Sequence, residues 1–488
     1  MGPKKVQISQ EAFNAVVKEN VEEFDMELAE ALEDAIKTFQ MQGADLSGSN
    51  SLLHNKHLSF FIFPFPLMHS ASDDDHNIAQ HCKGIAELLY DEGLCGPSYE
   101  KIIAAQRLLL AMCLGSEPGD TLVAVKNGGI EASISAYQAL KGVGDQWAII
   151  SLETLCSLLA DDNGRERFGS ANGPQIVLEA LTKDDSISHL GAAVLAAAAT
   201  KNERLKEMFM DLGADCLLVE YLKRHQFQRD LNSKTTSYSA PDAAALQAGC
   251  DAIFSLVTAD DMRPAASKAY GNAMKIAKAG AVDAILAVLP NIPKSTPILS
   301  TLCLTLKSLA VNDEICKTVA EQGGLDTVLQ FLDQAIQTGN KVVAKSACAL
   351  LSQLAGSDAN KDAIVSSGGL NQIIALMSAF QEEPAVLQEG FAAIATLTLR
   401  SPQNASKAVQ AGAVDIAAEM MEKHPGSAAM LRQACQMLRN LSVRNLENRP
   451  IILEKGLEPL IRKAKASHES CKDVASAALR DLGFDNYL

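Results

Sequence analysis

The sequence predicts an all-α protein: a right-handed α-solenoid of repeats preceded by an acidic helical arm. Two observations carry this prediction. A glycine motif recurs at nearly constant spacing along the chain, which is typical of repeat architectures. Ala and Leu recur at helical spacing while only 5% of the 488 residues are aromatic, and this composition favours helices packed on helices over a sandwich or barrel.

The glycine motif consists of small or polar residues, a glycine and an apolar start, as in NGGI, QGGLDTVL and SGGLNQII. Its successive occurrences lie 40 to 45 residues apart, except for one step of 67 residues that indicates a local insertion. A similar step back from the first occurrence reaches Gly84 in KGIAELL, which suggests a degenerate first unit. The first glycines of the motifs are Gly128, Gly173, Gly213, Gly280, Gly323, Gly368, Gly412 and Gly456.

One plan recurs inside each unit. A short helix such as 314–321 precedes the glycine, which accepts a positive φ and lets two helices meet at a sharp angle. A second helix such as 325–335, a polar break at 337–340 and an apolar third helix such as 342–355 follow. When the third helices are aligned, one position is small or apolar in five units, so we expect these side chains to be buried. It holds Cys250, Cys303, Cys348, Phe391 and Cys435.

Three regions precede or interrupt the repeats. Residues 1–46 read as an acidic arm of two helices that either docks on the first repeats or binds something separate. Residues 47–75 read as a disordered linker or an insertion, because Pro64 and Pro66 break its apolar run. The solenoid is expected over 76–488, with an inserted loop at 223–245 that is either a plain surface loop or a docking loop regulated by phosphorylation.

Composition and motif searches exclude several classes. The net charge of −16 shows no overall basic footprint of the kind that nucleic-acid binders carry, and no apolar run is long enough to span a membrane. The eleven cysteines form no C-x-x-C pair, and no secretory signal opens the chain, so we expect a cytoplasmic or nuclear protein. No nucleotide-binding, zinc-binding or nucleophile motif occurs. We therefore expect no enzyme activity, no cofactor, no metal, no nucleic acid and a monomer.

A repeat of about 42 residues, built as a short helix, a glycine elbow and two antiparallel helices, resembles the armadillo repeat of importin-alpha and beta-catenin. The opening ISQEAFNAVVKENVEEFDM, the following QMQGADLS and the order of repeats with one long insertion look like the armadillo repeat-containing protein 6 family. That family has no assigned reaction. The resemblance therefore implies a repeat scaffold rather than a particular chemistry.

The armadillo resemblance also implies a concave groove lined by third helices, in which an Asn near each helix end clamps a peptide. Asn440 matches that Asn, whereas the same column elsewhere holds other polar residues and no Trp stands one turn earlier. Binding of nuclear-signal peptides is therefore disfavoured. In three units a lysine or arginine stands one residue before this aligned polar position. These cations either attract an acidic segment of a partner or only reach the carbonyls at the ends of their own helices. The candidate groove residues are Ser255, Lys307, Ser308, Gln353, Thr396, Arg439, Asn440, Arg480 and Asp481.

The sequence thus predicts a non-catalytic scaffold or adaptor that holds a protein segment in this groove. One alternative is a co-chaperone or assembly factor whose acidic arm meets a second partner. A less favoured alternative is an enzyme whose site is assembled from distant residues.

Overall fold

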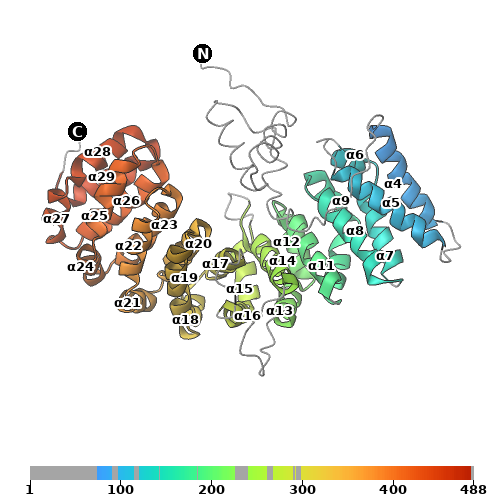
Figure 1. Cartoon of the computed structure of the whole chain (residues 1–488), viewed down its shortest axis with the longest axis horizontal. Coiled ribbons are helices and arrows are strands. Elements are labelled where there is room, and N and C mark those ends of the chain that lie inside the picture. Colours follow the sequence, from blue (N-terminus) through green and yellow to red (C-terminus); the bar gives the residue numbers. More distant parts are fainter. Residues whose placement is uncertain are drawn as a thin grey trace, which may run out of the picture. The chain divides into compact units, whose positions relative to one another are not determined.

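The computed structural model describes residues 74–90, 97–114, 120–141, 143–183, 185–225, 240–260, 267–289, 292 and 298–484. Within these ranges every regular element is a helix, which confirms the all-α class (Figure 1). The predicted arm 1–46, and residues 47–73 of the predicted linker, lie outside the described residues. The chain divides into two compact units, Met1–Ala171 and Asn172–Leu488.

The first unit holds a helix pair, one complete three-helix repeat and the first helix of the next repeat. The pair packs against the second and third helices of the repeat that follows it. Gly84 lies inside the first helix rather than at an elbow, so the spacing of the glycine motif does not extend to it. The helices are α4 (Asp74–Tyr90), α5 (Pro97–Cys113), α6 (Asp120–Lys126), α7 (Gly129–Leu140), α8 (Asp145–Leu158) and α9 (Asp162–Ser170).

The second unit continues the same plan from the second helix of that repeat to the end of the series. Its first and second helices alternate with longer third helices. The first helices are α12 (Glu203–Asp211), α15 (Ala269–Lys278), α18 (Asp313–Glu321), α21 (Asp358–Ser366), α24 (Pro402–Gln410) and α27 (Asn448–Glu454). The second helices are α10 (Gly173–Leu181), α13 (Ala214–Arg224), α16 (Ala281–Val288), α19 (Gly324–Thr338), α22 (Gly369–Ala379), α25 (Ala413–Lys423) and α28 (Leu457–Ser467).

The third helices of this unit stack on one another in chain order, so each repeat covers the apolar flank of its neighbour (Figure 1). The shared position of the third helices is buried as predicted, and burial raises the pKa of three of its thiols, in Cys303, Cys348 and Cys435, to about 12. These thiols therefore act as small core side chains. The third helices are α11 (Asp185–Ala199), α14 (Ala240–Val257), α17 (Ile298–Leu309), α20 (Lys341–Leu354), α23 (Pro384–Thr398), α26 (Ala428–Ser442) and α29 (Lys472–Asp481).

The elbow between first and second helices needs a left-handed residue. Seven predicted glycines meet this need, with φ between 70° and 102°. The remaining elbow, the second along the chain, differs: Asn172 takes the left-handed conformation at φ 59° and Gly173 begins α10. Asparagine tolerates this region better than most residues, which explains the one-residue shift.

A second glycine follows the elbow in some repeats for a different reason. A Cβ on Gly324 would lie 2.6 Å from the carbonyl oxygen of Val319, at the point where α18 and α19 almost touch. The close approach of two backbones, rather than backbone conformation, therefore demands glycine at this position.

Side-chain amides tie successive repeats together. The Nδ2 groups of four asparagines in first helices donate hydrogen bonds to backbone carbonyls in the last turn of the preceding third helix, at 2.8 to 3.2 Å. Such carbonyls have no partner within their own helix. The asparagines are Asn272, Asn360, Asn404 and Asn448.

Both ends of the predicted loop 223–245 belong to helices. Helix α13 continues through Arg224, whose guanidinium donates to the carbonyls of Lys183 and Leu181, and α14 begins at Ala240. Residues 226–239 lie outside the described residues. The basic residues at the start of the predicted loop therefore belong to a helix end, where cations are favoured.

Candidate functional site: the third-helix face

Each third helix of the second unit leaves one stripe of side chains at least partly exposed. The stripe follows the helical repeat of three and four residues, and the remaining positions are buried between neighbouring helices. We call the stripes of α14 to α29 together the third-helix face. Its main members are Gln247, Asp251, Phe254, Leu304, Lys307, Ser308, Lys345, Ser352, Gln353, Gln388, Thr396, Arg432, Gln436, Arg439, Arg480 and Asp481.

Polar contacts bridge every neighbouring pair of third helices along this face. Gln247 donates to Thr301 at 2.7 Å between α14 and α17, and Gln353 donates to the Ala310 carbonyl at 2.7 Å across α17 and α20. The hydroxyls of Ser352 and Thr396 lie 3.1 Å apart between α20 and α23. The face is therefore held in place before any partner arrives.

The next bridge joins α23 to α26. Asn440 donates from Nδ2 to the Ala395 carbonyl at 2.8 Å, and its Oδ1 accepts from Gln436 at 3.1 Å. Asn440 is only 8% exposed, so the residue predicted to clamp a peptide here joins α23 to α26. Its side chain shapes the face rather than projecting from it.

The other predicted hydroxyls are engaged locally. Ser255 is buried and donates to the Ala252 carbonyl within its own helix, so it does not reach the face. Ser308 and Thr396 are half-buried and donate to the carbonyls of Leu304 and Ala392. The predicted column therefore runs along the edge of the face, with two buried members, Ser255 and Asn440.

The predicted basic column divides into two parts. Asp481 lies between two of its arginines, 3.1 Å from Nε of Arg439 and 3.2 Å from Nε of Arg480, so one carboxylate neutralises part of their charge. Lys307 stands apart on α17, and within the described residues no carboxylate forms an ion pair with it. The structure thus brings Arg439 and Arg480 together around Asp481 and leaves Lys307 apart from them.

Two apolar residues of the third-helix face were not among the residues predicted from the aligned third helices. Phe254 on α14 and Leu304 on α17 are each 38% exposed. Leu304 stands one turn before Ser308, and a search for large apolar residues on the flank of the column would have found both. Exposed apolar side chains beside polar ones are typical of protein-binding surfaces.

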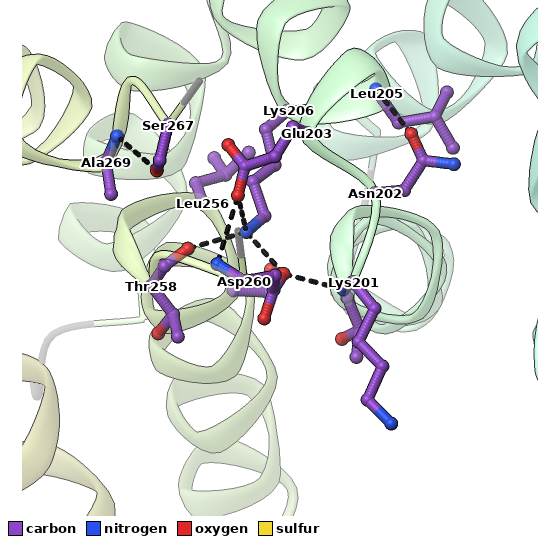
Figure 2. Close-up of polar contacts among 12 residues, drawn as sticks. Lys201, Asn202, Glu203, Leu205, Lys206, Leu256, Thr258, Asp260, Ser267 and Ala269 are labelled. Carbon is purple, nitrogen blue, oxygen red and sulfur yellow. Dashed lines mark hydrogen bonds and ion pairs between the residues drawn. The ribbon is translucent and has the colours of Figure 1, made fainter. Parts of the chain in front are cut away.

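A second polar cluster surrounds a buried lysine, shown in Figure 2. The ammonium of Lys206 on α12 lies 3.1 Å from Glu203 Oε1, 2.6 Å from the Thr258 carbonyl and 2.5 Å from Asp260 Oδ2. Asp260 also accepts from the backbone amide of Lys201 at 2.7 Å. The lysine is 1% exposed and satisfied on three sides, so the cluster ties α12 to the segment after α14 and offers no open site.

A histidine on α11 is expected to make stability depend on pH. Burial, with a smaller contribution from nearby His225, lowers the pKa of His189 to about 4 from an ordinary 6.5. The folded chain therefore keeps this ring neutral, while the unfolded chain protonates it as the pH falls below 6.5. The contribution that the neutral His189 ring makes to the free energy of unfolding at pH 7 is lost as the pH falls from 6.5 to 4. We expect this loss to reach about 2 kcal/mol by pH 5.

Urea unfolding at pH 7 and pH 5 checks this expectation. The His189→Gln variant should lose less stability than the native chain over this interval. The matched control is His468→Gln, because His468 lies in an exposed setting at the end of α28. Equal pH dependence of the native chain and His189→Gln would contradict the expectation.

Among the described residues, no three His, Cys, Asp or Glu side chains are grouped so as to hold a metal ion. No helix in the described part of the chain is long and apolar enough to cross a bilayer.

Comparison with known families decides where the chain belongs. A family model described as ARMC6 matches residues 108–488, which is most of the chain. The chain belongs to the armadillo repeat-containing protein 6 family. A second model, the armadillo repeat-containing protein 6 N-terminal domain, matches residues 5–56 and so extends past the arm boundary expected at residue 46. The resemblance drawn from the sequence is therefore confirmed.

Individual members of the armadillo repeat-containing protein 6 family agree with this assignment. The human protein is 28% identical over 411 residues, which cover 81% of this chain and 75% of the relative. The Drosophila melanogaster homologue is 27% identical over 404 residues, which cover 82% and 78%. Among solved structures, an engineered protein with a TM-score of 0.53 and 19% identity matches over 82% of this chain and 98% of its own, so the two share a fold over that span.

Proposed function

We propose that this chain is a non-catalytic adaptor that binds a segment of a partner protein on the third-helix face. The observation that carries the proposal is the continuous series of bridged third helices from α14 to α29, with polar and apolar side chains exposed along it. A surface already ordered by its own packing lowers the entropy lost on binding.

Phe254 and Leu304 are the contacts expected to contribute most to binding. Both are apolar, partly exposed and surrounded by packed neighbours on α14 and α17. Burying a large apolar side chain removes much apolar surface from water, whereas contacts at a solvated rim contribute little to binding. The predicted groove residues Lys307 on α17 and Gln353 on α20 then provide polar surroundings.

The chemistry of the thiols favours a reducing compartment, which we propose to be the cytosol or nucleus. The ten described cysteines are all free, and most of them are buried. Free thiols in this number are typical of proteins that remain in the reducing interior of the cell.

Site-specific photocrosslinking in cells tests the adaptor proposal. A photoreactive phenylalanine analogue replaces Leu304 or Phe254 in the full chain, and crosslinked proteins are identified by mass spectrometry. Leu212, which is 42% exposed beside an elbow away from the third helices, is the matched control position. We expect a partner crosslinked from the face and not from Leu212. Crosslinks from Leu212 with none from Leu304 or Phe254 would overturn the proposal.

A further inference from the structure

Charge is distributed unevenly along the third helices of the second unit. The five helices α17, α20, α23, α26 and α29 together carry seven lysines and arginines against three acidic residues. The two preceding third helices, α11 and α14, carry three acidic residues and no lysine or arginine. The later part of the face is therefore basic in a chain whose net charge is −16.

The helix dipole accounts for only part of this basic charge. Cations are favoured near the C-terminal end of a helix, which explains Lys307 and Arg439 in the last turns of α17 and α26. Lys345 and Arg432, however, are the fifth residues of α20 and α26, and Lys341 opens α20. These cations lie toward the positive ends of their helices, so stability of the helix gives no reason for them.

Several of these cations also have no acidic partner among the residues that the structure describes. Lys341 pairs with Glu383 at 3.4 Å, and Arg439 shares Asp481 with Arg480. Within the described residues, Lys307 and Lys345 form no ion pair, and Arg432 donates to the carbonyl of Ser470 at 2.7 Å rather than to a carboxylate. These three cations remain available to neutralise charge on a partner.

We propose that the third-helix face from α17 to α26 binds an acidic protein segment, whose charges meet Lys307, Lys345 and Arg432 and whose apolar residue contacts Leu304. This inference rests on the proposed adaptor function and adds the chemistry and location of the segment. Complementary charge steers association and fixes register along an interface. Asp251 on α14 carries the same charge as the segment, so the segment lies toward the C-terminal repeats.

A protein segment fits this face better than a nucleic acid. Single-stranded nucleic acids bind by stacking bases on exposed aromatic rings beside basic side chains. In α17, α20, α23 and α26, Phe391 is the single aromatic residue, and it is fully buried. The large exposed apolar side chains on these helices are Leu304 and Val342, which suit an aliphatic or aromatic residue of a polypeptide.

Fluorescence anisotropy with the full chain and a labelled peptide tests the inference. The probe is a short peptide of glutamates interrupted by leucines, and its counterpart carries lysine in place of each glutamate. We expect the acidic probe to bind, with an affinity that falls as salt is raised, and the lysine peptide not to bind. The Lys307→Glu/Lys345→Glu variant should weaken binding about tenfold or more.

The matched control makes the same charge change away from the face. Lys407 on α24 and Lys463 on α28 are exposed residues of first and second helices, and Lys407→Glu/Lys463→Glu should change affinity by about twofold at most. Equal weakening by both double variants would overturn the inference, because overall charge rather than the face would then explain binding.

Competition separates the remaining outcomes. Displacement of the acidic probe by a single-stranded oligonucleotide at lower concentration would assign the face to nucleic acid and overturn the inference. In another outcome, a peptide of residues 8–41 displaces the probe at a lower concentration than any external acidic peptide does. That result would assign the face to the chain's own arm and would also overturn the inference. If Leu304 crosslinks a partner while the acidic and lysine peptides bind equally, the inference fails and the adaptor function stands.

Discussion

Replacing Lys206 with methionine is expected to lower the free energy of unfolding by roughly 2 kcal/mol, because it removes the buried ammonium that two partly exposed carboxylates share. The ammonium of Lys206 contacts Glu203, the Thr258 carbonyl and Asp260, all within 3.1 Å. Methionine fills a similar volume, so the loss reports the charge contacts rather than a cavity. Urea unfolding followed by circular dichroism measures it.

Two further variants separate the cluster from a general effect of lysine removal. Lys361 occupies the same helix position in α21, but its carboxylate partner Asp358 is exposed to solvent. Lys361→Met should therefore cost about 1 kcal/mol. Adding Asp260→Asn to Lys206→Met should recover part of the loss, since it removes one uncompensated charge. Equal losses for Lys206→Met and Lys361→Met would contradict the account.

Replacing Gly324 with alanine is expected to cost about 3 kcal/mol, because the new methyl group meets backbone that cannot move independently. Its Cβ would lie 2.6 Å from the Val319 carbonyl oxygen and 2.6 Å from Val319 Cγ1. The preceding elbow is different: Gly323 has φ 78° but open space around it, so Gly323→Ala should cost about 1 kcal/mol from backbone strain alone.

The same substitution in α15 provides a control of opposite sign. Gly271 lies in a helix with no atom within 4 Å of its added Cβ. Gly271→Ala should therefore leave stability unchanged or raise it by about 0.5 kcal/mol, because alanine loses less backbone entropy in a helix. Urea unfolding midpoints should rank Gly271→Ala above Gly323→Ala and Gly324→Ala last. Any other order would contradict the steric explanation.

The repeat plan was predictable from the sequence because its determinants are local. A left-handed glycine and an apolar helical period are both visible in a short window, and α18 and α20 begin and end within one residue of the prediction. Helix α19 extends three residues further than predicted, to Thr338, because Gln337 and Thr338 continue the helix into Gly339. The glycine motif predicted the elbow at Gly173, whereas Asn172 takes the left-handed conformation, because asparagine also tolerates it.

The details of the candidate face were less predictable because they depend on neighbouring repeats. Alignment placed Ser255 and Asn440 in one column with Ser308, but packing buries the first two. Gln353 and Asn440 find carbonyl partners on the preceding third helix, which no local pattern indicates. The offset between adjacent helices determines these contacts, and that offset is a tertiary property.

The asparagine amides that join each first helix to the preceding third helix also have a mechanical meaning. Because each bond crosses from one repeat to the next, a rotation at that junction must stretch or break it before the helices separate. The last repeats should therefore resist bending as a stiff elastic element. Their amide backbone hydrogens should correspondingly exchange slowly and as a group, since opening one junction exposes the flanks of two repeats at once.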